Sequence, residues 1–277
     1  MARIITDSTA DLGAEIAREF KIDVIPLAVN IGDKTYRDGL DLQPSGLFEL
    51  VQQTGELPKT SAASVAEFER FFGGDEDVVY VGISSQLSAT LQNARLAVQG
   101  SIDGRVRIVD SLNLSTGVGL LALLAADLRD QGLSADEIKR RVDEARSRVR
   151  TSFIVETMEY LYKGGRCSAL QAIVGSVLKI RPIIEVRPDG TMGVKEKARG
   201  TRQKGLQSML DDFAAHLPEL DRKRVFITHT GCDADAEFLR QEIARLADPQ
   251  EIRTTLAGSV ISSHCGPDTI GILYMVK

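Results

Sequence analysis

The chain has 277 residues, 43% of them hydrophobic, and a formal net charge of −5 from 34 basic and 39 acidic side chains. This composition is typical of a globular protein and excludes the disordered and fibrous classes. The acidic balance, the absence of tryptophan and the 5% aromatic content argue against a nucleic-acid-binding protein, which needs basic surface and stacking side chains. The length predicts about two domains of ordinary size.

Targeting and metal signals are also weak. No apolar leader follows Met1, so we expect no signal peptide, and the longest apolar run, around residues 119–126, is too short to cross a membrane. The cysteines, Cys167, Cys232 and Cys265, form no CxxC pair, and the 3 histidines are scattered. We therefore predict neither a disulfide framework nor a metal site, and a reducing cytoplasm as the location.

The first half of the chain alternates strand and helix patterns. We predict strands at residues 2–6, 23–29, 78–83 and 105–109, a hairpin within 30–36, and helices at 11–20, from Pro44 onward, and at 64–72, 89–99, 117–130 and 135–149. Two of the helices begin with a capping box, in which Ser64 pairs with Glu67 and Ser134 with Glu137. Alternating apolar strands and helices predict an N-terminal three-layer α/β/α domain with a parallel sheet over residues 1–150.

The second half has a different pattern. Strands are predicted at residues 152–155, 181–186, 192–197, 225–228, 251–257 and 269–276, with helices near 168–177, 201–216 and 234–247. Asp189-Gly190 between two strands is a hairpin signal. We expect a C-terminal α/β domain with a mixed sheet over residues 151–277.

Small hydroxyl side chains follow the strands of the predicted parallel sheet, where open α/β sheets bind ligands. They gather at residues 6–9, 84–90 and 111–116, and in a loop at residues 58–61. Ser and Thr are also the preferred N-caps of helices. The pairs Thr60-Ser61 and Ser84-Ser85 exceed what one cap needs, which favours an anion-binding rim.

Three other segments allow more than one interpretation. Gly117 to Ala122 fits GxGxxA but lacks the acidic residue of a dinucleotide site, which favours helix packing. Lys163-Gly164-Gly165-Arg166 is a helix stop that could also form a basic lip. The basic residues between Lys195 and Lys204 form either a solvated face or a surface that attracts an acidic partner.

His264 is the histidine most suited to chemistry. It lies in a segment of small residues from Gly258 to Pro267, interpreted as a loop between two strands. Cys265 beside it suggests a thiol nucleophile, but adjacent side chains diverge and no third group is evident, so a Cys-His pair is disfavoured.

Seven motifs stand in an order that resembles one known family. They are Thr6-Asp7-Ser8-Thr9-Ala10-Asp11-Leu12, Tyr36-Arg37-Asp38-Gly39, Thr60-Ser61 with Ser64, Ile83-Ser84-Ser85 with Leu87-Ser88, Asp110-Ser111, Lys163-Gly164-Gly165-Arg166, and the segment from Gly258 to Pro267. Over the whole chain the sequence resembles the DegV family of bacterial fatty-acid-binding proteins.

The resemblance implies a particular architecture and role. It implies two α/β domains with a long-chain fatty acid in a buried tunnel between them, and no cofactor besides this ligand. It also implies a non-enzymatic carrier, whose separate ATP-binding kinase subunit phosphorylates the fatty-acid carboxylate, with at most peripheral membrane contact and no nucleic acid as partner.

The resemblance also assigns residues to the site. Thr60 and Ser88 match the hydroxyls that bind the carboxylate, and Arg199 and His264 match residues at the mouth that act when the carboxylate is phosphorylated. The neighbours of the head-group pocket would be Thr6, Asp7, Ser61 and Ser85. The chain departs from the family pattern at Ala89, where glycine is more common, and at Asp268, which adds a negative charge near the mouth.

Physical chemistry is compatible with this ligand. About fifteen buried methylenes at ~0.8 kcal/mol each supply roughly 12 kcal/mol before the cost of association, so the carboxylate needs only enough donors to offset its desolvation. Two rival functions remain open: a serine hydrolase or acyltransferase that uses Ser85 or Ser88 with His264 as base, and an interaction protein that docks through the basic run.

Overall fold

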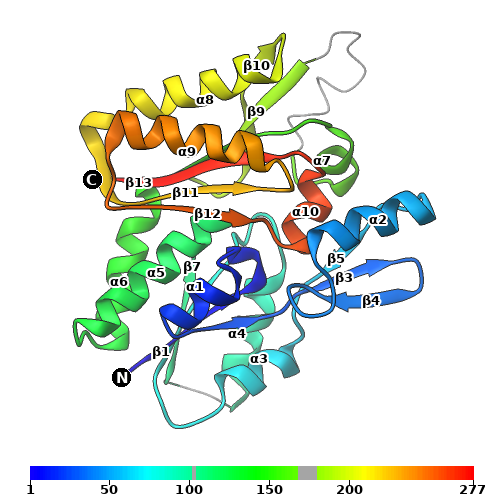
Figure 1. Ribbon diagram of the computed structural model, residues 1–277. Coiled ribbons are helices and arrows are strands. Elements are labelled where there is room, and N and C mark those ends of the chain that lie inside the picture. Colours follow the sequence, from blue (N-terminus) through cyan, green and yellow to red (C-terminus); the bar gives the residue numbers. More distant parts are fainter. Residues whose placement is uncertain (102–103, 168–179) are drawn as a thin grey trace.

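The computed structural model describes residues 1–101, 104–167 and 180–277 (Figure 1). Its first sheet is parallel, with the strand order β2-β1-β6-β7. The strands are β1 (Arg3–Asp7), β2 (Ile22–Ile25), β6 (Val78–Gly82) and β7 (Val106–Asp110). This is the parallel sheet predicted for the first half of the chain.

Both faces of this sheet are buried, as expected for parallel strands. Ile4 and Val79 face one apolar core, which includes residues of α5 and α6, and Ile5 and Tyr80 face another, which includes residues of α3 and α4. The helices of this half are α1 (Gly13–Glu19), α2 (Pro44–Thr54), α3 (Val65–Phe72), α4 (Thr90–Ser101), α5 (Thr116–Asp130) and α6 (Ala135–Ala145). Both predicted capping boxes are present. The three-layer prediction is confirmed.

A small antiparallel sheet with the order β4-β3-β5 adjoins the parallel sheet. It consists of β3 (Ala28–Ile31), β4 (Lys34–Arg37) and β5 (Lys59–Ser61). The single strand predicted over residues 23–29 is wrong: β2 ends before Pro26, which has no N–H to donate to a sheet. The loop predicted at residues 58–61 is also wrong, because β5 pairs there with β3 and sets Thr60 opposite Val29.

The third sheet is mixed and has six strands in the order β10-β9-β8-β13-β11-β12. They are β8 (Val149–Ile154), β9 (Ile180–Val186), β10 (Met192–Arg199), β11 (Leu220–His229), β12 (Glu251–Leu256) and β13 (Ile270–Val276). Only β11 and β12 run parallel. α8 (Arg202–Ala215) and α9 (Asp233–Ala247) cover one face (Figure 1). The mixed sheet is as predicted; the helix expected near residues 168–177 lies outside the described residues.

Helix α5 packs against both large sheets. A Cβ on Gly117 would lie 2.1 Å from Asn113 Oδ1, and one on Gly119 would lie 2.8 Å from the Ala10 carbonyl oxygen. These glycines therefore permit close approach of the helix, which confirms the helix-packing interpretation of the GxGxxA segment. The division of the chain at residue 150 stays a prediction: β8 opens the six-stranded sheet, while the core of α5 reaches Phe226 and Leu273 of that sheet.

Helix α7 (Glu159–Gly164) ends at the predicted helix stop, with Gly165 as its C-cap, whereas α10 (Ser259–Cys265) was not predicted. The loop interpretation of residues 258–267 is wrong for most of its length. Serines favour caps and turns, but here Ser262 Oγ donates to the Ala257 carbonyl and Ser263 Oγ to the Ser259 carbonyl. These bonds satisfy the hydroxyls inside the helix. Among the described residues, short 3₁₀ helices are η1 (Ser8–Ala10), η2 (Arg146–Arg148) and η4 (Leu217–Glu219). No helix in the described part of the chain is long and apolar enough to span a membrane.

Candidate functional site

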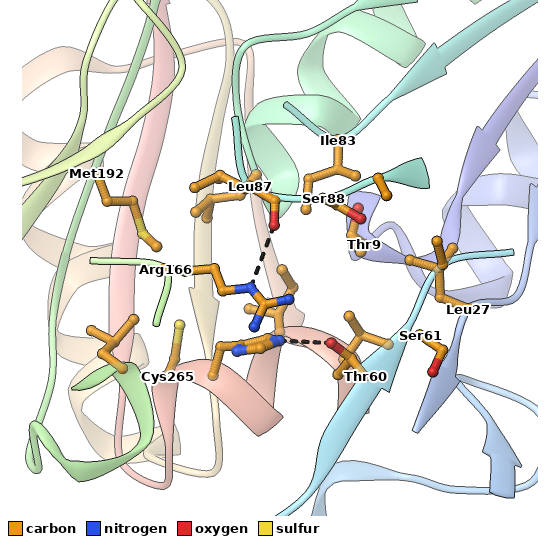
Figure 2. Close-up of a pocket in the computed structure, with 17 residues that line it drawn as sticks. Thr9, Leu27, Thr60, Ser61, Ile83, Leu87, Ser88, Arg166, Met192 and Cys265 are labelled. Atoms are coloured by element: carbon orange, nitrogen blue, oxygen red, sulfur yellow. Dashed lines mark hydrogen bonds between the residues drawn. The ribbon is translucent and has the colours of Figure 1, made fainter. Parts of the chain in front are cut away.

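A cavity of about 190 Å³ lies between the two halves of the chain (Figure 2). Polar groups reach it from both halves: Thr60 and Ser88 from the first, Arg166 and His264 from the second. The apolar part of its described lining consists of Leu27, Ala62, Ile83, Leu87, Ala89, Leu114, Leu161, Met192, Val260 and Ile261. The cavity thus combines a mostly apolar wall with a few hydroxyl and nitrogen groups.

A smaller cavity of about 20 Å³ adjoins the first one. The two share Leu114, Ile261 and Cys265 in their walls, and Phe153 and Leu273 line the smaller one. These three shared residues form the wall between the two cavities.

Thr60 and His264 meet in the larger cavity. The Thr60 Oγ1 atom lies 2.8 Å from His264 Nε2 (Figure 2), so β5 of the first half and α10 of the second are hydrogen-bonded at this point. Burial, with a smaller contribution from the charge of Arg166, lowers the pKa of His264 to about 4. The imidazole is therefore neutral at neutral pH.

Glycine at position 164 makes room for this imidazole. A Cβ on Gly164 would lie 2.6 Å from His264 Nδ1, and that nitrogen is buried without a hydrogen-bond partner. The Lys163-Gly164-Gly165-Arg166 segment thus does more than end a helix, because α7 packs its glycine directly on the histidine ring.

Ser88 lies two residues before the first residue of α4. Its Oγ accepts a hydrogen bond from the Thr90 backbone N–H at 3.2 Å and lies 2.8 Å from Thr90 Oγ1. Either hydroxyl can be the donor of that pair, so the proton of Ser88 can point to Thr90 or into the cavity.

Only some of the proposed head-group neighbours reach the cavity. Ser61 lines it and accepts a hydrogen bond from Asn30 Nδ2 at 3.0 Å. Thr6 does not line it, because its hydroxyl is buried and donates to the Val81 carbonyl. Ser85 is exposed and does not line it either; its backbone N–H donates to Asp110 Oδ1.

Asp7 is also absent from the cavity wall. It is fully buried and accepts hydrogen bonds from Tyr80 Oη at 2.8 Å and from the Ile83 N–H at 3.1 Å. Burial raises the pKa of this carboxyl, although these hydrogen bonds oppose the shift. Thr9 lies between Asp7 and the cavity, lines the cavity itself, and donates its hydroxyl to Asp7.

Arg166 is the site residue that sequence reasoning noticed only as part of a basic lip. Figure 2 shows its guanidinium group between the Leu87–Ser88 side of the cavity and Thr60. It lies 3.5 Å from the Leu87 carbonyl and 2.5 Å from the Gly164 carbonyl. Arg199 ends β10 and pairs through its backbone with Ile180 of β9; its side chain lies outside the described residues, so its place at the mouth stays a prediction.

Two members of the basic run from Lys195 to Lys204 form ion pairs. Lys195 lies 2.7 Å from Asp212, and Arg202 lies 2.5 Å from Asp235. Acidic neighbours of this chain already neutralise these two cations, which favours the solvated-face interpretation for them.

Comparison with known proteins identifies the family. The family described as "Uncharacterised protein, DegV family COG1307" matches residues 1–277. The chain belongs to the DegV family. A DegV domain-containing protein of Caldanaerobacter subterraneus is 32% identical, with 99% of this chain and 98% of that protein covered.

Solved DegV structures have the same fold. The fatty-acid-binding DegV family protein from Thermus thermophilus is 31% identical with a TM-score of 0.93, covering 100% of this chain and 99% of that one. The Streptococcus pneumoniae Fatty Acid Kinase (Fak) B3 protein, solved loaded with linoleic acid, has a TM-score of 0.86 over 100% of both chains. It is 24% identical, so this second likeness concerns the fold alone.

The geometry of this DegV chain does not favour the hydrolase alternative. His264 Nε2 bonds to Thr60, not to Ser85 or Ser88. In the part of the chain that the structure describes, no carboxylate bonds His264 Nδ1, whereas a serine hydrolase needs that contact to orient its base.

Proposed function

We propose that this protein binds a long-chain fatty acid in the cavity between its halves and presents the carboxylate to a separate ATP-dependent kinase in the cytoplasm. The observation that carries the proposal is the cavity itself, which has a mostly apolar wall and a polar part that includes the hydroxyls of Thr60 and Ser88. The likeness to the fatty-acid-binding DegV protein of Thermus thermophilus supports it.

The hydrogen-bond partners of both hydroxyls suit a carboxylate ligand. If Thr90 donates to Ser88, the Ser88 proton is free for the ligand. If His264 carries its proton on Nε2 and donates to Thr60, the Thr60 proton is free as well. Two O–H donors then offset the desolvation of the carboxylate, and burial of the acyl chain supplies the affinity.

Neutral donors leave the carboxylate reactive toward a phosphoryl group. A bidentate arginine would hold the ligand more tightly but would also withdraw charge from the oxygen that must attack. Arg166 and His264 line the same cavity, and we expect them to interact with a phosphate once it is attached. The kinase step rests on this chemistry and on the family resemblance.

Lipid extraction tests the binding part. The purified protein is denatured, its extract is analysed by mass spectrometry, and delipidated protein is offered palmitate or oleate. We expect about one fatty acid per chain. An extract without lipid, together with no uptake of added fatty acid, would contradict the proposal.

A coupled assay tests the kinase part separately. Fatty-acid-loaded protein is incubated with a bacterial fatty-acid kinase subunit and ATP, and acyl phosphate is trapped as the hydroxamate. We expect hydroxamate with the wild type and a large loss with His264→Ala. Loaded wild-type protein that yields no hydroxamate, with a kinase active on its own carrier, would contradict this part alone.

A further inference from the structure

Two carboxylates of the first half of the chain hold the start of α10. The backbone N–H of Gly258 donates to Asp11 Oδ1 at 2.8 Å, and the N–H of Ser259 donates to Asp38 Oδ1 at 2.6 Å. Asp11 follows η1, and Asp38 follows β4, whereas α10 connects two strands of the six-stranded sheet. The bonds therefore join the two halves.

Both carboxylates are deeply buried. Asp11 is 4% exposed and Asp38 is 3% exposed, and neither forms an ion pair within the described residues 1–101, 104–167 and 180–277. Asp11 Oδ2 also accepts a hydrogen bond from Ser115 Oγ at 2.6 Å, while Asp38 Oδ2 has no partner. Burying carboxylates without a cation is costly. The hydroxyls of Ser115 at Asp11 and of Ser8 at Asp38 offset part of this cost, and backbone N–H groups at the start of α10 offset a further part.

The contact is too close to admit any side chain at position 258. A Cβ on Gly258 would lie 2.9 Å from both oxygens of Asp38 and 3.2 Å from Asp11 Oδ1. A third bond, from Ser259 Oγ to the Leu42 carbonyl at 3.1 Å, fixes the same end of the helix. The start of α10 is therefore held from several directions.

The other end of α10 forms part of the ligand cavity. Ile261, His264 and Cys265 line that cavity, and neither Asp11 nor Asp38 does. The two carboxylates lie instead in the wall of a separate cavity of about 540 Å³ near the start of α10. α10 has seven residues and is about 10 Å long, and backbone hydrogen bonds link its successive turns. We therefore expect a shift at Gly258 to reach His264.

We propose that Asp11 and Asp38 are positioning residues for the ligand cavity, and that their carboxylates hold α10 where His264 reaches Thr60. Because Thr60 belongs to the first half and His264 to the second, their 2.8 Å contact requires α10 to keep a fixed position relative to the first half. The two carboxylates belong to the first half and fix that position. The proposal deepens the proposed function, since it concerns the residues of the same cavity.

Histidine NMR reads the position of His264 without any ligand. The chain has 3 histidines, and His216, which contacts Tyr274 and the Asp212 carbonyl, serves as the internal reference. In Asp38→Ala we expect the side-chain signals of His264 to shift and its pKa to rise from about 4 toward the ordinary 6.5, because the ring leaves Thr60 and meets water. The signals of His216 should stay unchanged.

Matched variants separate positioning from mere stability. Asp38→Asn keeps an acceptor for the Ser259 N–H and should restore the His264 signals, with fatty-acid affinity within about threefold of wild type, whereas Asp38→Ala should lose roughly tenfold. Asp41→Ala is the control, since Asp41 is exposed and pairs with Arg37; it should change neither readout. Ser115→Ala removes one bond to Asp11 and should shift the His264 signal less, in the same direction.

The outcomes are distinct. Variants that lower the melting temperature but leave the signals, the titration of His264 and the fatty-acid affinity unchanged would overturn the proposal. If Asp38→Ala does not fold, an unaltered His264 signal in Ser115→Ala would also overturn the proposal. A chain that takes up no fatty acid would refute the proposed function, while the His264 signal would still report on the positioning role.

Discussion

Hydroxyl side chains occupy two regions of this molecule in different ways. At the parallel sheet, Thr6 donates to the Val81 carbonyl and Ser84 to the Gly190 carbonyl, and both are fully buried. In the ligand cavity, Thr60 bonds to an imidazole and Ser88 to another hydroxyl. A hydroxyl that is bonded to a carbonyl must be the donor of that bond, because a carbonyl only accepts, so it cannot donate to a ligand as well. A hydroxyl that is bonded to a histidine or a threonine can instead accept from that partner and donate its own hydrogen bond to a ligand.

Asp7 belongs to the first region, where hydrogen-bonding groups are buried with fixed partners. Replacing Asp7 with alanine should cause the largest effect, a loss of roughly 3 kcal/mol in the free energy of unfolding, since the buried Tyr80 hydroxyl and Ile83 N–H lose their acceptor. Urea denaturation measures this loss. The matched variant Asp7→Asn keeps one acceptor oxygen and should lose less; equal stability of all three proteins would show that this carboxylate is not structural.

The cavity region should respond in the opposite manner. Thr60→Ala and Ser88→Ala should each lower fatty-acid affinity about tenfold and together about a hundredfold, with little change in stability, because each removes one donor to a charged carboxylate. Titration calorimetry with the delipidated protein measures the affinity. Thr6→Val is the control from the first region and should change stability more than affinity. Full affinity in the double variant would refute the head-group assignment.

Arg166 tests whether a charge in the cavity contributes as much as the hydroxyls. Its side chain is exposed, so solvent and salt screen it. Arg166→Gln should weaken fatty-acid binding about threefold at low salt, and this difference should shrink at 1 M salt. Calorimetry at two salt concentrations checks this. A tenfold or larger loss that salt does not reduce would mean that Arg166 binds the carboxylate directly.

The smallest expected effect is on the pH dependence of stability. The pKa of His264 is about 4 in the folded protein, below its ordinary 6.5, so the unfolded chain binds the proton more readily between these values. The histidine's contribution to stability is therefore lost as pH falls from 6.5 toward 4. As pH falls, the free energy of unfolding should decrease less steeply in His264→Gln than in the wild type. The difference between the two slopes should correspond to at most about one bound proton.

The wild-type minus variant difference isolates this effect. Burial raises the pKa of Asp38 to about 6, which gives that carboxyl a pH dependence of opposite sign, but Asp38 is present in both proteins and cancels. Parallel pH profiles for the two proteins would indicate that His264 is not neutral and buried in solution.

Sequence patterns anticipated the sheets well because apolar periodicity and capping are local. The capping box of Ser64 and the hairpin at Asp189-Gly190 both appear where expected. The site was anticipated only in part. Residue type showed that Thr60 and Ser88 carry hydroxyls, but which of many hydroxyls face a cavity depends on contacts over more than a hundred residues, such as that of Thr60 with His264.

The residues that sequence reasoning missed share a physical cause. α10 contains three serines whose helical state depends on tertiary bonds, including those of Asp11 and Asp38 to its first residues. Arg166 stands in a helix stop, and its entry into the cavity depends on how α7 packs against His264. Neither effect has a local signature.

Helix α5 imposes a constraint on how a ligand could come and go. Because it packs on both large sheets and its glycines admit close contact with each half, swinging the sheets apart would expose a continuous apolar core at about 25 cal/mol per Å². A hinge opening of the whole molecule is therefore expensive. The lifetime of a bound lipid should be governed by small displacements of the side chains around the cavity, and dissociation rates should respond to substitutions there far more than to substitutions along α5.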